Sequence, residues 1–302
     1  MRKLPVIRSV SEVFSGVTRH YLQLVGAAWP ALVFVAIGLG LYGWAYYESG
    51  AFEVFAMLQQ GQSMEEIAAA MEAADRGALG PAYFAGFLIM FLASAVAAVR
   101  WHRFVLMGEG NGGLIRAEDG RYIWTFIKVM LLYLVAIFAL VLVFVGIAAI
   151  AGAFSDAGNT GVASILMLIF GIGIVAAYLL VLGFLLRLML ALPDAAIGQP
   201  GKVIGIFPAS QGNTWRMAGY GILIGLIYTV ILFGLVLIMG LLGAVLGGGA
   251  IAVLLLGAVG LAAYFYFLML QITMLSVAYR EIVGLPGGHE GEATVAEPSP
   301  GL

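Results

Sequence analysis

The sequence predicts an all-α integral membrane protein, built as a bundle of six transmembrane helices. Hydrophobic residues make up 63% of the 302 positions and charged residues only 10%, whereas soluble domains have about 25% charged residues. So few charges cannot cover a surface that faces water, and most of the surface must therefore face hydrocarbon. The uncharged runs also lack the alternating period of a lipid-facing barrel, and helices satisfy their own backbone hydrogen bonds in lipid.

The individual spans follow from uncharged runs that reach the roughly 20 residues a helix needs to cross the hydrocarbon core. The last run, 217–279, has 63 residues and is too long for one crossing. The glycine triplet 247–249 within it is expected to form a tight turn between two helices. The predicted spans are therefore 21–47, 77–99, 129–155, 157–186 and the two halves of 217–279.

The basic residues indicate how the spans are oriented. An even number of spans places both termini on one side, and 13 of the 14 Lys and Arg residues fall on that side, with Arg76 alone opposite. By the positive-inside rule this side is cytoplasmic, which predicts a bacterial inner-membrane protein with both termini inside. No secretory signal peptide fits, because the first apolar run begins at Tyr21 and is too long for an h-region.

This organisation divides the chain into three parts. Residues 1–20 are predicted to form a cytoplasmic amphipathic helix that lies along the membrane surface. Residues 21–283 form the transmembrane domain, and residues 284–302, rich in Pro, Gly and Glu, are predicted to be a disordered cytoplasmic tail. The apolar stripe of the N-terminal helix consists of Val10, Val13, Phe14, Val17 and Tyr21.

Two sequence patterns predict helix starts outside the spans. Ser9 with Glu12, and Ser63 with Glu66, have the spacing of a capping box, in which the two side chains satisfy free backbone N–H groups. The first pair predicts the start of the N-terminal helix. The second predicts a short helix in the loop on the outer side.

Three helical hairpins of common ancestry are one interpretation of the even-numbered spans. Arg100 and Arg187 end the second and fourth spans and lie 87 residues apart, and Thr273 follows 86 residues after Arg187. Such a parallel repeat is one way in which transporters are built. The alternative is chance, because apolar low-complexity sequence aligns with itself easily.

The densest group of chemically active side chains lies where the second span ends. Arg100, His102, Arg103 and Glu109 fall within ten residues there. Arginine binds phosphate bidentately, so this group is a candidate site for a lipid headgroup or a phosphorylated ligand. The alternative is that the arginines only anchor the span at the cytoplasmic interface.

A second candidate region begins where the fourth span ends. Arg187 lies inside an apolar run, and a charge held there needs a partner or water, for which Asp194 is the candidate. Asn213, Trp215 and Arg216 follow in a loop that is able to carry ligand contacts. The alternative is that Asn213 caps the fifth span while Trp215 and Arg216 anchor it.

Several classes of function are excluded or disfavoured. The chain has no cysteine and only three histidines, so neither a thiol nucleophile nor a multi-histidine metal site is expected, and no cofactor is predicted. No phosphate-binding loop, HExxH pair or GxSxG elbow occurs, and nothing indicates nucleic-acid binding. The first, third, fifth and sixth spans carry no acid or base at mid-membrane, which argues against proton coupling.

Three segments, 100–109, 187–198 and 207–216, resemble known membrane proteins. Residues 101–109 read WHRFVLMGE and residues 192–198 read LPDAAIG. Together with residues 207–216 they resemble poorly characterised six-span inner-membrane proteins of proteobacteria. The architecture is also similar to the membrane domain attached to some glycerophosphodiester phosphodiesterases. The sequence has no counterpart of the attached hydrolase domain, so the resemblance does not carry over that activity.

These observations favour a non-enzymatic inner-membrane protein that binds or handles lipid or a small amphiphile at its cytoplasmic face, or assists membrane partners there. The alternative is a permease or channel for a small solute, supported by the repeat and weakened by the lack of mid-membrane charges. A lipid-modifying membrane enzyme is a third candidate, with His102 and Glu109 as its acid and base.

Overall fold

A computed structural model describes residues 2–50, 57, 62–73, 80–109, 116–246 and 250–285, without the side chains of 70–73 and 250–254. Every regular element within these residues is a helix. Six helices are long and apolar enough to cross a membrane. The predicted all-α fold with six spans is therefore confirmed, and the chain is a membrane protein.

Five of the six long helices are longer than the uncharged runs that predicted them, and α6 has the same length as its run, 30 residues. Segments that contain charged residues extend the helices beyond the apolar part at the polar side, so that the third long helix begins at Ala117 instead of Val129. The long helices are α1 (Val6–Glu48), α4 (Gly80–Met107), α5 (Ala117–Asp156), α6 (Thr160–Met189), α9 (Thr214–Leu246) and α10 (Ala250–Ile282). The short ones are α3 (Met64–Ala73), α7 (Ala191–Ala196) and α8 (Ile206–Ala209).

The N-terminal helix is joined to the first span in α1, with a kink at His20, where φ is −109° and ψ is 16°. The expectation that its apolar stripe lies on the membrane surface is wrong. Val10, Val13 and Val17 are buried in the main hydrophobic core of the protein. The stripe is apolar because it packs against protein.

One of the two predicted capping boxes is confirmed. Glu66 N–H donates to Ser63 Oγ (3.3 Å), and Ser63 N–H donates to the Glu66 carboxylate (3.0 Å), directly before α3. The box at Ser9 and Glu12 is wrong. There α1 starts one turn earlier, after Pro5, so Ser9 is buried inside the helix and Glu12 pairs with Arg280 of α10. The predicted glycine turn 247–249 and residues 286–302 of the predicted tail lie outside the described residues.

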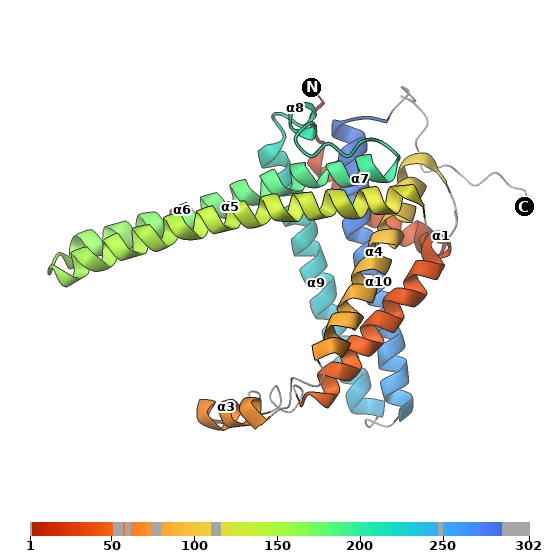
Figure 1. The fold of residues 1–302 in the computed structure, drawn as a ribbon, viewed down its shortest axis with the longest axis horizontal. Coiled ribbons are helices and arrows are strands. Elements are labelled where there is room, and N and C mark those ends of the chain that lie inside the picture. Colours follow the sequence, from red (N-terminus) through yellow and green to blue (C-terminus); the bar gives the residue numbers. More distant parts are fainter. Residues whose placement is uncertain are drawn as a thin grey trace, which may run out of the picture.

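The long helices fall into two groups. Figure 1 shows α4, α9, α10 and the part of α1 beyond its kink running side by side as a bundle, while α5 and α6 run together away from it. The start of α1, the end of α10, α7 and α8 lie at the same end of the bundle, which we call the polar end. The α5–α6 hairpin leaves from this end.

The α5–α6 hairpin exposes apolar surface along most of its length. The most apolar stretch of α5 is only 6% buried inside the protein, and that of α6 is not buried at all. Ring contacts such as Phe144 with Phe170, 5.3 Å between centroids, join the two helices to each other. Because such a surface is unfavourable in water, the hairpin requires hydrocarbon around it.

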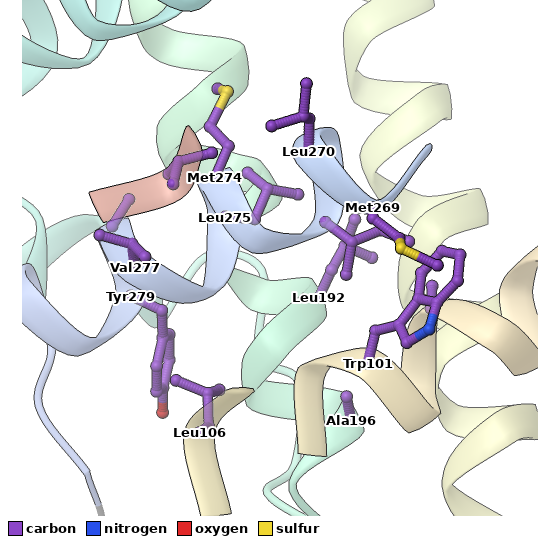
Figure 2. Packing of buried hydrophobic residues seen from close by; sticks show 14 of the residues in the cluster. Trp101, Leu106, Leu192, Ala196, Met269, Leu270, Met274, Leu275, Val277 and Tyr279 are labelled. Atoms are coloured by element: carbon purple, nitrogen blue, oxygen red, sulfur yellow. The ribbon is translucent and has the colours of Figure 1, made fainter. Parts of the chain in front are cut away.

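The buried core lies close to the polar end. Trp101 and Leu106 of α4, Leu192 of α7, and Met269 and Tyr279 of α10 pack into one cluster there (Figure 2). Trp101 Nε1 donates to the Leu24 carbonyl oxygen of α1 (2.7 Å), so the indole polar atom is satisfied within the core. This packing fixes the side chains that surround the candidate site.

Candidate functional site

Arg100 and Asp119 form a buried ion pair between α4 and α5. The two guanidinium nitrogens donate to the two carboxylate oxygens at 3.0 and 2.9 Å, and both side chains are almost completely buried. Asp119 also accepts the backbone N–H of Arg116 (2.7 Å), which closes the first turn of α5. The charge of Arg100 is therefore compensated within the protein, and the structure does not present it to a ligand.

Arg103 is also paired, with the acid that the sequence placed beside it. Its Nε and Nη2 atoms donate to Glu109 at 2.9 and 2.6 Å, and Nη1 donates to the Ala196 carbonyl oxygen (3.2 Å). Arg116 lies 3.5 Å from the same Glu109 oxygen, and Glu118 lies 3.8 Å from Arg103. The group at the end of α4 is thus a network of ion pairs that joins α4, α5 and α7.

His102 is completely buried and points to α10. Its Nδ1 forms a hydrogen bond with Ser276 Oγ (2.7 Å), and Ser276 Oγ also lies 3.1 Å from the Ile272 carbonyl oxygen. Within the described residues, His102 Nε2 has no hydrogen-bond partner. His102 and Glu109 are the candidate acid and base. His102 is hydrogen-bonded to Ser276, whereas Glu109 is paired with Arg103.

Arg187 differs from the arginines of α4 because all its partners are uncharged. Its Nε donates to Ser210 Oγ (3.0 Å), Nη1 to Thr214 Oγ1 (2.7 Å) and Nη2 to the Phe207 carbonyl oxygen (3.0 Å). The guanidinium carbon lies 4.7 Å from the Phe207 ring centre and 5.6 Å from that of Phe184. The side chain is only 6% exposed. In the part of the chain that the structure describes, no carboxylate forms an ion pair with it.

The predicted pairing of Arg187 with Asp194 is wrong. Asp194 accepts the Tyr279 hydroxyl (2.8 Å) and the Gly201 backbone N–H (3.1 Å) instead. Asp194 lies in α7, beyond the end of α6, and α7 packs against α4, α5 and α10. The carboxylate therefore joins the core, while Arg187 remains on the side of α6 that contacts α9.

Asn213 and Arg216 hold the N-terminal segment of the chain. The Leu4 backbone N–H donates to Asn213 Oδ1, and Asn213 Nδ2 donates to the Arg2 carbonyl oxygen, both at 3.0 Å. Arg216 donates to the Leu4 carbonyl oxygen (2.9 Å). These residues act as structural clamps, whereas Trp215 is 62% exposed beside them.

Among the described residues, the predicted site residues thus include a neutralised network of ion pairs and a buried guanidinium, that of Arg187, whose hydrogen-bond partners are all uncharged. Arg100, Arg103 and Glu109 belong to the network, and Arg187 stands apart from it. The different partners of Arg100 and Arg187 give no support to the threefold repeat, which stays a prediction.

The sequence interpretation missed four hydrogen-bond partners. Asp119 binds Arg100, and Ser210 and Thr214 bind Arg187, at separations of 19 to 27 residues along the chain. Ser276, the partner of His102, lies on another helix, α10. For Asp119, its place in the first turn of the next helix was an available signal.

Among the described residues, no group of three or more His, Asp or Glu side chains could hold a metal ion. Comparison of the chain with protein-family models, with curated proteins and with solved structures finds no match.

Proposed function

We propose that this protein is a non-enzymatic component of the bacterial inner membrane that binds the anionic headgroup of a lipid or other amphiphile through Arg187. The observation that carries this proposal is the guanidinium held at the end of a membrane span with only uncharged partners. A guanidinium has five N–H donors, and the protein takes one from each of its three nitrogens. Two donors and one full positive charge remain for a ligand.

An anionic headgroup fits this position chemically. Arginine forms short, charge-assisted hydrogen bonds to phosphate, and it loses less hydration than lysine when it does so. The rings of Phe184 and Phe207 flank the guanidinium and fix its plane. The bound phosphate would supply the negative charge that no described side chain supplies.

The surroundings of Arg187 suit the membrane interface. Trp215, next to its partner Thr214, is 62% exposed, and Ile204, in the segment between α7 and α8, is 79% exposed. Tryptophan is enriched where the headgroups meet the hydrocarbon. The excess of basic residues at the polar end supports a cytoplasmic location, where anionic lipids attract basic groups.

The proposal is tested by purifying the protein in native-lipid discs and measuring the lipids that remain bound by mass spectrometry. The variant is Arg187→Gln, which keeps hydrogen-bond donors but removes the charge. We expect an anionic lipid that is enriched on the wild type to fall about tenfold in the variant, because charge-assisted hydrogen bonds contribute about 1.5–3 kcal/mol.

The matched control is Arg121→Gln, another arginine of the polar end, which donates to the Gln199 carbonyl oxygen and shares no hydrogen-bond partner with Arg187. It should leave the bound lipid unchanged, and both variants should keep the wild-type melting temperature within a few degrees. An identical set of bound lipids in the wild type and in folded Arg187→Gln protein would refute the proposal.

A further inference from the structure

A second site lies deeper in the membrane part of the bundle, between α9 and α10. A cavity of about 520 Å³ lies along the contact between the two helices and is open on one side, where Gln271 is exposed; its size is within the range of small-molecule sites. Its α9 wall includes Tyr228 and Leu232, and its α10 wall includes Ala263 and Phe267. The other lining residues follow these at helical spacing, so one face of each helix forms the whole wall.

Three polar groups line this apolar cavity: the hydroxyls of Tyr228 and Tyr264 and the side-chain amide of Gln271. Within the described residues, none of the three has a hydrogen bond, although both tyrosine rings contact phenylalanine rings. In hydrocarbon an unsatisfied polar group is costly, because no water is present to replace the missing partner. Three such groups around one cavity indicate a ligand with hydrogen-bonding atoms.

The ligand must be uncharged. No charged residue lines the cavity, and none occurs anywhere between Met217 and Tyr279. Bringing an ion to this depth without a counter-charge is strongly unfavourable. By contrast, a carbonyl or hydroxyl oxygen suits the amide and phenol groups. Gln271 and Tyr264 lie two helical turns apart, about 10 Å along α10, so the ligand's polar part can extend over that length.

Access to the cavity comes from the bilayer and not from the polar end. On the side toward the polar end, the buried Tyr220 hydroxyl donates to the Met274 carbonyl oxygen (3.1 Å) and ties α9 to α10. Ile224, one turn further along α9, is also buried. A molecule that reaches Gln271 must therefore arrive laterally, already dissolved in the membrane.

We infer that the α9–α10 cavity binds an uncharged lipid of the diacylglycerol type, whose ester and hydroxyl oxygens hydrogen-bond to Tyr228, Tyr264 and Gln271. The hydrocarbon chains of this lipid lie along the apolar walls. This inference concerns a different site from Arg187 and does not depend on the anionic headgroup proposed there.

The experiment uses the full chain in phosphatidylcholine discs that contain a photoactivatable diacylglycerol. After illumination, mass spectrometry maps the labelled peptides. We expect labelling of α9 and α10 at the cavity. A photoactivatable phosphatidate with the same chains should label these peptides several-fold less, because its charge excludes it. Equal labelling by both probes would refute the inference and indicate ordinary contact with bulk lipid.

Two kinds of variant test the mechanism of binding. Gly260→Leu fills the cavity, because a Cβ at Gly260 would already come within 3.9 Å of Met239 Cε across it. Gln271→Leu with Tyr264→Phe removes polar groups and preserves shape. Both should reduce diacylglycerol labelling about tenfold, and unchanged labelling in either would refute the inference.

Gly257→Leu is the matched control, since a side chain at Gly257 meets no atom within 4 Å. It should label like the wild type. Arg187→Gln should also label like the wild type, which separates this inference from the proposed headgroup site. Loss of labelling in Gly257→Leu would show that any bulky change in α10 abolishes it, and would refute a specific cavity site.

Discussion

Gly183 of α6 lies directly against the backbone of Thr214 at the start of α9, where a Cβ would overlap the Thr214 carbonyl oxygen. Arg187 follows Gly183 by one helical turn on the same face of α6 and donates to Thr214 Oγ1. The close approach that glycine permits therefore brings the guanidinium within reach of α9. The position of the candidate cation depends on the absence of a side chain at Gly183.

Gly183→Ala should destabilise the protein by about 1–3 kcal/mol, because the added methyl group forces α6 away from α9. Thermal unfolding in detergent measures the loss. Gly173→Ala is the control, since a Cβ there meets no atom within 4 Å. It should be neutral or slightly stabilising, because alanine favours helix more than glycine does. Equal stability of both variants would mean that the α6–α9 contact is not tight.

Asp119→Ala should destabilise the protein by about 3–5 kcal/mol, because it leaves the buried guanidinium of Arg100 without a counter-charge. The double variant Arg100→Met with Asp119→Leu should recover most of this loss, since both charges are then absent. Equilibrium unfolding of the single and double variants gives the coupling free energy. Additive losses in the double variant would contradict a directly coupled pair.

Asn213→Ala should release the N-terminal segment from the start of α9. The side-chain amide holds both the Leu4 N–H and the Arg2 carbonyl oxygen, and alanine replaces neither bond. We expect limited trypsin digestion to cut faster after Lys3 and Arg8, while cleavage elsewhere in the folded protein is unchanged. Asn159→Ala, at the far end of the α5–α6 hairpin, is the control. An unchanged rate of N-terminal cleavage would show that Asn213 does not hold this segment.

Single cysteines should report the topology, because the natural chain contains none. With six spans, cysteines at Ser63 and Asn159 should react with a membrane-impermeant maleimide added outside intact cells, and a cysteine at Gln199 should react only after lysis. Labelling at Asn159 also tests the hairpin directly. Its protection from the outer reagent, with Ser63 labelled, would mean that α5 and α6 do not cross the membrane.

Local patterns predicted the features that depend on neighbouring residues. The start of α3 after Ser63 was predictable because both capping partners lie within one turn of each other. The same pattern at Ser9 gave a wrong prediction, because α1 begins after Pro5. Ser9 therefore lies inside the helix and is buried in the protein, and it does not mark a helix end. A capping pattern alone does not distinguish a helix end from a polar residue inside a packed helix.

The partners of the arginines depend on contacts that are distant in sequence. Glu109, six residues after Arg103, was within reach of sequence reasoning and is its partner. Asp194, seven residues after Arg187, was nearly as close in sequence but accepts a hydrogen bond from Tyr279 of α10, because α7 directs it toward that helix. Proximity along the chain therefore identified one ion pair and failed for the other.

The sequence by itself determined that this is an all-α membrane protein with six spans, because hydrocarbon tolerates only long, nearly uncharged helices. It also located the candidate arginines at span ends. Only the tertiary structure decided which of them keep an uncompensated charge, that α5 and α6 leave the other four helices, and that Gln271 faces a cavity. The physical reason is that apolar patterns specify contact with lipid or core equally well, whereas helix packing selects which helices and polar groups meet.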